Sequence, residues 1–328
     1  MTTKQQISNA AWIAKAWAMF AVIVAHTDFT GVEHSPIYML LKRFGSMAVP
    51  VFLILAGYFF NADKISSFGM LLKKKAVALG LPWLCLGTLV YVFVAWRSGG
   101  SFSLSKGILF LFGHGSYLYY LTLLIVLQIL FYFLRNISRT ALLVGSLSVS
   151  AASLLLTASG VMAPVIEMLR ITNYLNVFNW VGFFAIGFYA QKFDHDSMLA
   201  RLRNLWKPAL AVWCVLCVAG YFIESAYGYF SWLGYIMELC SSIVWLYLSI
   251  IMCRCEWLCS LGKYSFTIYL LHIQIIPIVA VFMNRNIVTL LFSPVVSYVM
   301  TGALIWCLLW IAQKLHIREP IKKLIGMR

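Results

Sequence analysis

Apolar segments long enough to cross a lipid bilayer recur along the whole chain. Crossing about 30 Å of hydrocarbon takes roughly 20 apolar residues in a helix, whose backbone groups bond within the segment. Of the 328 residues, 62% are hydrophobic and 11% are charged, which leaves too little polar surface to cover a soluble protein. The sequence therefore predicts an all-α integral membrane protein, with one transmembrane domain over 1–328 and about ten transmembrane helices. We expect these at 11–29, 46–61, 77–96, 117–134, 141–159, 176–191, 208–225, 230–253, 264–283 and 290–313.

The positive charges are divided unevenly between the two sides of the predicted membrane domain. The net charge is +15, and most of the 25 lysines and arginines fall in alternate loops on the side of the N-terminus. Such an excess is typical of cytoplasmic loops, so we expect both termini in the cytoplasm. The basic residues are scattered over short loops, which argues against nucleic-acid binding.

The N-terminal segment, the cysteines and segment 191–207 allow further predictions. The first apolar segment is interrupted by Lys15 and lacks a small-x-small cleavage site, so we expect it to remain as a helix of the mature protein. The eight cysteines imply no disulfide framework. Cys253-x-Cys255-x3-Cys259 has no matching ligand set nearby, so we expect no metal site and no permanently bound cofactor. The mixed apolar and basic segment 191–207 predicts a short amphipathic helix at the membrane surface.

A lysine and a histidine share one face of the first predicted helix. Lys15 and His26 are eleven residues apart, which brings them back almost to the same face, roughly 16 Å apart along the axis. Ionisable side chains inside a bilayer are costly, so they usually face the protein interior and serve a function. This pair therefore indicates where the chemistry takes place.

His26 has two interpretations. In the structural one, its ring donates a hydrogen bond to a backbone carbonyl; in the functional one, it is a general acid or base, because its ordinary pKa of about 6.5 suits proton removal from a hydroxyl. Asp28 lies about 200° round the helix and cannot orient His26 along the same face. Glu33, Glu167 and Glu224 remain as candidate carboxylate partners from other segments.

Other candidates are less specific. The run Lys73, Lys74 and Lys75 either anchors the topology or holds a phosphorylated cofactor, and the two roles are compatible. Gly57, with Tyr58 beside it, interrupts an apolar run, as happens where a backbone lines a cavity or packs closely. His272 is a second histidine in a predicted span, either structural or catalytic.

These residues belong to a series of short motifs that occur in a fixed order. The motifs are Lys15 with His26, segment 49–60, Lys75 with Pro82, segment 117–121, segment 183–189 and segment 269–272. In this order they resemble acyltransferase family 3 of bacterial membrane proteins, from the first span to the ninth. The chain departs from the family pattern with Lys15 for arginine, Ala56 for serine, Ala78 for a second base and Tyr119 for the tryptophan of H-x-W-Y-L.

The resemblance implies a bacterial inner-membrane enzyme that moves an acyl group, most often acetyl, from acetyl-CoA or another acyl-CoA to a carbohydrate hydroxyl. The acceptor would be an O-antigen, capsule, exopolysaccharide or lipid-linked sugar beyond the outer face, and membrane lipids would surround the protein. Lys15 and Lys73–Lys75 would then hold the donor phosphates, and His26 would activate the acceptor or become acylated. Gly57, Tyr58, Tyr119, His272, Glu167 and Glu224 are candidates for substrate contact or structural support.

A transporter of a lipid-linked sugar or small solute is the alternative from a different class. It too needs titratable groups within the membrane. A proton-coupled transporter generally has intramembrane carboxylates, whereas here the acidic residues fall at span ends or in loops, with Glu238 as the exception. This pattern favours the acyltransferase.

Overall fold

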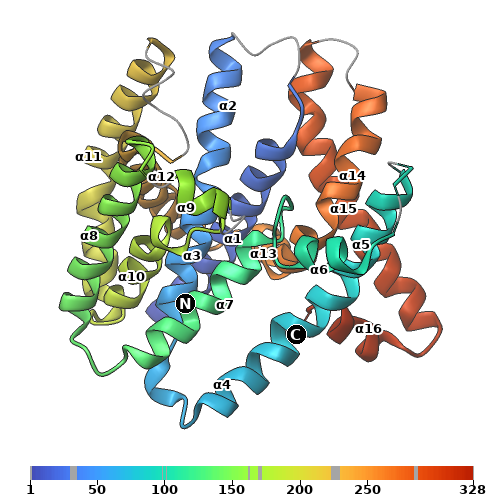
Figure 1. Ribbon diagram of the computed structural model, residues 1–328, viewed down its shortest axis with the longest axis horizontal. Coiled ribbons are helices and arrows are strands. Elements are labelled where there is room, and N and C mark those ends of the chain that lie inside the picture. Colours follow the sequence, from blue (N-terminus) through green and yellow to red (C-terminus); the bar gives the residue numbers. More distant parts are fainter. Residues whose placement is uncertain are drawn as a thin grey trace.

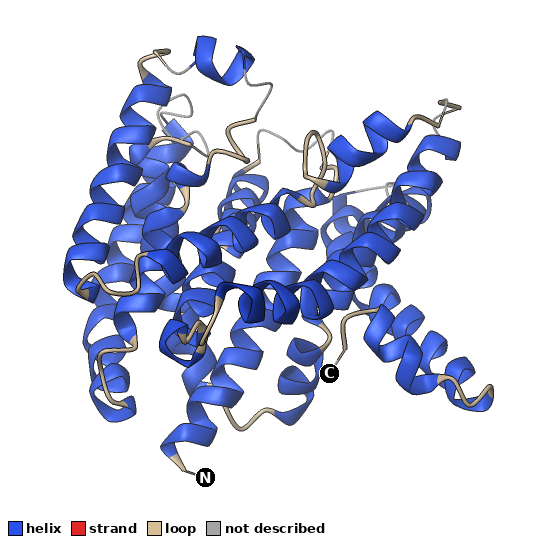
Figure 2. Ribbon diagram, turned by 60° about the horizontal axis from the view of Figure 1, so that its bottom comes forward, coloured by secondary structure: helices blue, strands red, loops and turns tan. Residues whose placement is uncertain are grey.

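The structure, a computed structural model, describes residues 2–29, 35–97, 99–100, 102–161, 163–168, 172–222, 230–283 and 287–327. Its regular elements are helices, and the described residues form no strand (Figure 2). Each of the ten predicted apolar segments contains a helix, which confirms the all-α class. The α-helices are α1 (Thr3–His26), α2 (Pro36–Ser46), α3 (Ala48–Phe59), α4 (Phe68–Lys75), α5 (Leu81–Arg97), α6 (Leu104–Leu111), α7 (Tyr119–Phe133), α8 (Arg139–Ala158), α9 (Ala163–Met168), α10 (Val181–Ala190), α11 (His195–Phe222), α12 (Trp232–Ile251), α13 (Glu256–Lys263), α14 (Ser265–Met283), α15 (Ile287–Lys314) and α16 (Arg318–Leu324). Short turns are the 3₁₀ helices η1 (Ala62–Lys64) and η3 (Val177–Asn179) and the π-helical turn η2 (Ala76–Gly80).

Eight helical segments in the described part of the chain are long and apolar enough to cross a membrane. They are Thr3–His26, Pro36–Phe59, Phe68–Arg97, Arg139–Ala158, His195–Phe222, Trp232–Ile251, Ser265–Met283 and Val288–Lys314. The remaining two predicted spans correspond to the shorter apolar helices α7 and α10. At 1.5 Å per residue, α10 is only about 15 Å long, so it cannot cross the hydrocarbon alone.

Two predicted boundaries were wrong. The second span begins at Pro36, not near residue 46, because α2 and α3 follow each other with a single residue between them. The predicted second span left out α2 with its basic pair Lys42 and Arg43, yet Arg43 is buried inside the protein. The amphipathic segment 191–207 is not a separate surface helix either, since α11 continues from His195 through Pro208 to Phe222.

Helix α1 lies at the centre of the bundle (Figure 1). It packs against α2, α3, α12, α13, α14 and α15, so it is enclosed by segments from both halves of the chain. Small residues make this possible, because alanines allow neighbouring backbones to approach closely. The buried alanines of α1 are Ala10, Ala11, Ala14, Ala16, Ala18 and Ala21.

A second close contact joins α3 to α10. A Cβ atom added at Gly57 would clash with the carbonyl oxygen of Phe184, and one added at Gly187 would clash with that of Ile54. The two backbones therefore touch through glycines. This contact holds the short helix α10 inside the protein, where Phe183 and Phe184 are fully buried.

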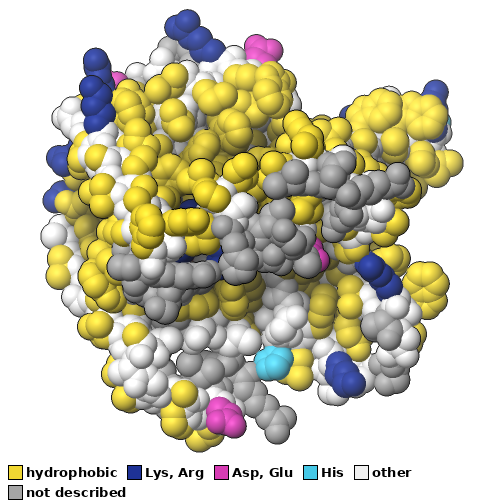
Figure 3. Space-filling model, turned by 90° about the horizontal axis from the view of Figure 1, so that it is seen from above, with side chains coloured by type: hydrophobic (Ala, Val, Ile, Leu, Met, Phe, Trp, Pro, Cys, Tyr) yellow, Lys and Arg dark blue, Asp and Glu magenta, His cyan; other side chains and the backbone are white. Residues whose placement is uncertain are grey.

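Hydrophobic side chains cover much of the surface. Seen from the end where α2 begins, the visible face is largely apolar, and its few lysines and arginines lie mostly towards the margin (Figure 3). Several helices also present large exposed apolar residues, among them Trp96, Phe222, Val281 and Trp306. An apolar exterior of this extent is typical of a protein surrounded by lipid.

Candidate functional site

His26 is the last residue of α1 and lies at a cavity. Its Nδ1 atom is 2.8 Å from the carbonyl oxygen of Val22. A carbonyl only accepts hydrogen bonds, so in the neutral ring Nδ1 carries the proton and Nε2 keeps a lone pair. The backbone bond of the structural interpretation is therefore present, and it leaves the other nitrogen in the form that a general base requires.

The cavity beside His26 has a volume of about 680 Å³. Residues from α1, α2, α3, α5, α6, α7 and α14, from the loop between α6 and α7 and from the segment before η3 line it. Its polar lining includes His26, Ser116, Tyr117, Tyr119, Tyr120, Thr172, Tyr174 and Tyr269. Hydroxyl and aromatic groups around an imidazole form a surface that suits a polar, uncharged ligand. We call this the histidine cavity.

His272 is the imidazole that lies against His26. The two ring centroids are 5.2 Å apart, with the rings edge to face. Nδ1 of His272 lies 2.7 Å from the carbonyl oxygen of Tyr269, so Nδ1 is again the protonated nitrogen. Its Nε2 is buried and forms no hydrogen bond with the described residues. Sequence had left His272 between structural and catalytic roles; the structure places it directly beside the candidate base.

The predicted carboxylate partners do not gather here. Glu167 is exposed on α9 and does not line the histidine cavity. Glu33 and Glu224 lie outside the described residues. Tyr119, by contrast, lines the cavity and packs its ring against Tyr174 at a centroid distance of 5.0 Å.

A second cavity of about 560 Å³ lies on the side where α1 begins, and we call it the lysine cavity. Lys15 and Lys263 both line it. The ammonium of Lys15 also lies 4.2 Å from the ring centroid of Trp12. Lys263 ends α13, which packs closely on α1, because a Cβ atom at Gly262 would clash with the carbonyl oxygen of Trp12. Two lysines at one cavity attract an anionic group such as a phosphate.

The run of three lysines lies outside this cavity. Lys73, Lys74 and Lys75 form the last turn of α4, where their positive charges complement the helix dipole. Lys73 and Lys74 are exposed, and Lys75 lies 5.8 Å from the ring centroid of Phe60. The lining of the lysine cavity resumes with Ala78 and Leu79, a few residues later.

Gly57 and Tyr58 have separate surroundings. Gly57 lies in the contact between α3 and α10 described above, so its role there is close packing. The Tyr58 hydroxyl is 3.3 Å from Nδ1 of His195 at the start of α11. Neither residue lines the histidine cavity or the lysine cavity.

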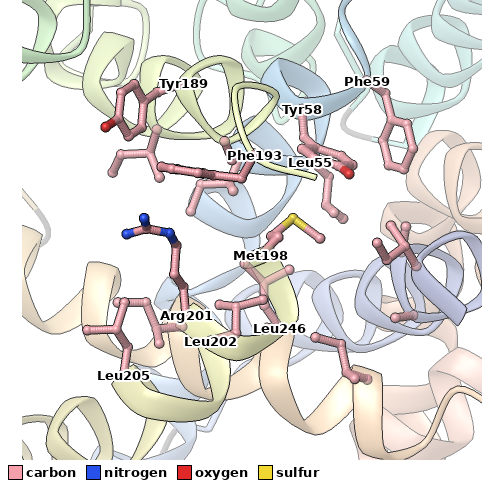
Figure 4. A pocket seen from close by; sticks show the side chains of 18 of the residues that line it. Leu55, Tyr58, Phe59, Tyr189, Phe193, Met198, Arg201, Leu202, Leu205 and Leu246 are labelled. Carbon is pink, nitrogen blue, oxygen red and sulfur yellow. The ribbon is translucent and has the colours of Figure 1, made fainter. Parts of the chain in front are cut away.

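Tyr58 instead lines a third cavity of about 300 Å³, which is mainly apolar (Figure 4). Leu55, Met198, Leu202 and Leu246 contribute to its walls. The guanidinium of Arg201 rises beside this space and lies 4.0 Å from the ring centroid of Phe193. No histidine or carboxylate among the described residues lines this cavity.

Glu238, the exceptional acidic residue of the sequence, is buried in α12. Arg43 of α2 is buried as well and interacts electrostatically with it. An arginine opposite a buried carboxyl group offsets part of the cost of burying that group. The described residues contain no group of three or more His, Cys, Asp or Glu side chains arranged to hold a metal ion.

Comparison with known proteins identifies the family. A family model described as an acyltransferase domain matches residues 12–312 of the 328. The chain belongs to acyltransferase family 3. Neither the curated proteins nor the solved structures that were compared with it gave a match. The matched range includes Lys15, His26, Lys263 and His272, and apart from Gly326 at the lysine cavity it includes every residue that lines the two cavities.

Family membership and the apolar helices together make the chain a multi-pass membrane acyltransferase. Lys263 was not predicted as a residue of the site, since it counted only as one of the basic residues in the loops. Tyr120 was likewise given no role of its own, although it lies within segment 117–121, whereas Lys263 lies outside every motif segment. Their signal was weak because a lysine or tyrosine near a span end is common in any membrane protein.

Proposed function

We propose that the protein transfers an acyl group, acetyl in the simplest case, from cytoplasmic acyl-CoA to a carbohydrate hydroxyl at the outer face. The supporting observation is the pair of cavities on opposite sides of the bundle. One contains two lysines and suits an anionic donor, and the other contains His26 and hydroxyl groups and suits a neutral sugar. With the N-terminus in the cytoplasm, as the distribution of positive charge favours, the lysine cavity faces the donor.

The chemistry follows from the form of the His26 ring. Its unprotonated Nε2 takes the proton of the acceptor hydroxyl, and the freed oxygen attacks the thioester carbonyl carbon. The carbon–sulfur bond then breaks as the new ester forms. The departing thiolate of CoA takes the proton from the imidazolium, so His26 returns to its starting state.

His272 supports this cycle by position. When His26 takes up the proton, it becomes a cation inside the protein, where an unbalanced charge is costly. The neutral ring of His272, with its unbonded Nε2, is the polar group in ring contact with His26. Its lone pair stabilises the cation without a fixed negative charge.

The alternative of a transporter is less well supported. A proton-coupled transporter generally has carboxylates within the membrane, whereas Glu238 is the one such candidate here and the matched family is one of acyltransferases. The acceptor classes remain those of the family resemblance: O-antigen, capsule, exopolysaccharide or lipid-linked sugar.

The test compares surface glycans, by mass spectrometry and NMR, from cells that lack the gene, express the wild type, or express His26→Ala. We expect alkali-labile acyl esters on the glycan only with the wild type. The matched control is His316→Ala, since His316 is an exposed histidine beyond the matched domain. Identical glycans with and without the wild-type protein would refute the carbohydrate acceptor.

A further inference from the structure

The two cavities meet at two tyrosines. Tyr120 of α7 and Tyr269 of α14 line both the histidine cavity and the lysine cavity, and no other described residue lines both. Their ring centroids are 5.7 Å apart, with the rings close to perpendicular. A single aromatic layer therefore separates the lysines from His26.

Tyr269 is the fixed side of this layer. It is buried, and its hydroxyl donates a hydrogen bond to the backbone carbonyl of Tyr117. Tyr117 in turn donates through its own hydroxyl to the carbonyl of Leu270, at 2.8 Å. This reciprocal pair joins α14 to the segment before α7, so the ring of Tyr269 is held by both.

Tyr120 is held by packing alone. Its ring lies against Tyr269 and against Phe52 of α3, with a centroid distance of 5.7 Å to Phe52. Its hydroxyl forms no hydrogen bond with the described residues. The side chain is half-buried, since it faces open space in both cavities. A change at Tyr120 thus alters the separation without breaking a polar contact.

An aromatic layer discriminates between the parts of an acyl-CoA. The phosphates are charged and would lose their hydration in crossing it, a cost that apolar side chains cannot offset. A thioester with a short acyl group is neutral and small. Each further methylene requires more room between the two rings, and a tight pocket distinguishes neighbouring chain lengths by about 10- to 200-fold.

We infer that Tyr120 and Tyr269 form the constriction through which the acyl group reaches His26, and that the ring of Tyr120 limits the acyl group to a short chain. This inference rests on the proposed function and adds to it the class of acyl donor. The tyrosines make and break no bonds. They are specificity-determining residues, and the proton steps remain those of His26.

The experiment measures a ratio within each variant. Membrane vesicles from expressing cells are incubated with labelled acetyl-CoA or hexanoyl-CoA, and label is counted in the glycan fraction. In Tyr120→Ala, we expect the hexanoyl-to-acetyl ratio to rise at least about tenfold. Tyr120→Phe keeps the ring and should keep the wild-type ratio. Tyr247→Ala is the control, because Tyr247 stacks on Trp206 away from both cavities.

Two results would overturn the inference. One is an unchanged ratio in Tyr120→Ala. The other, should that variant not accumulate, is an unchanged ratio in Tyr120→Leu, which fills more of the space. If the wild-type protein labels the glycan but substitutions at residue 120 leave the hexanoyl-to-acetyl ratio unchanged, this inference alone is contradicted. A wild-type protein that labels no glycan with any donor contradicts the proposed function instead.

Discussion

The imidazole rings of His26 and His272 lie edge to face with their centroids 5.2 Å apart, although one ends the first helix and the other lies in α14. Each ring donates from Nδ1 to a backbone carbonyl of its own helix, at 2.8 and 2.7 Å. Both Nε2 atoms are thereby left unprotonated in the neutral state. His26 lines the histidine cavity, whereas His272 is fully buried.

His26→Ala should lower acyl transfer at least about 100-fold, because a positioned general base contributes that much or more. The loss should appear in the labelled-glycan assay while the variant accumulates in the membrane at the wild-type level. His316→Ala should keep full activity. Near-normal transfer by a well-expressed His26→Ala protein would remove His26 from the catalytic role.

His272→Phe should lower the rate on the order of tenfold, equivalent to about 1.4 kcal/mol in the activation free energy. Phenylalanine keeps an aromatic ring against His26 but has no lone pair to face the imidazolium. The donor KM should not change, since His272 does not line the lysine cavity. If the phenylalanine variant is as fast as the wild type, His272 contributes packing only.

Lys15→Glu and Lys263→Glu should raise the acyl-CoA concentration needed for half-maximal transfer, and the effect should weaken at high salt because ions screen the attraction. Lys15→Arg, in contrast to Lys15→Glu, should keep donor use near the wild-type level, since it keeps the positive charge. Lys73→Glu is the matched control, as Lys73 is exposed and lines neither cavity. A larger effect at Lys73 than at Lys15 or Lys263 would move the phosphate site to α4.

Cysteines at two exposed positions test the orientation in the membrane. Ile37→Cys, at the start of α2, should react with an impermeant thiol reagent in intact cells, and Ser66→Cys, before α4, should react only after lysis. Both avoid the capping residues Ser35 and Ser67, whose side chains accept backbone hydrogen bonds. Native cysteines that label must first be replaced. The reverse labelling pattern would show that the protein has the opposite orientation in the membrane, with the lysine cavity on the outer side.

Gly57→Ala and Gly187→Ala should each destabilise the protein by about 1–3 kcal/mol, because the added methyl group forces apart two backbones in contact. Thermal unfolding in detergent measures the effect. Gly302→Ala in α15 is the control, since a Cβ atom there meets nothing within 4 Å. Equal stability of all three variants would show that α3 and α10 can separate without cost.

Hydropathy and helix periodicity are local properties of a segment. The sequence alone was therefore sufficient to predict features that depend only on them. Ten apolar segments predicted the helical class, and the separation of eleven positions from Lys15 to His26 predicted that both lie on one helix face. In the structure Lys15 lines one cavity and His26 lines the other. The same local reasoning missed α2 at the beginning of the second span, because Arg43 is polar in the sequence although it is buried in the structure.

Contacts between segments that are far apart in the sequence depend on how the helices pack. Only the tertiary structure shows these contacts. The sequence determined that this is a helical membrane protein with a lysine and a histidine on the first helix. It could not show that Gly262 lets α13 approach α1 and bring Lys263 to the lysine cavity. Nor could it show that α7 and α14 meet at Tyr120 and Tyr269, because ring contacts between helices follow from the whole bundle and not from either segment.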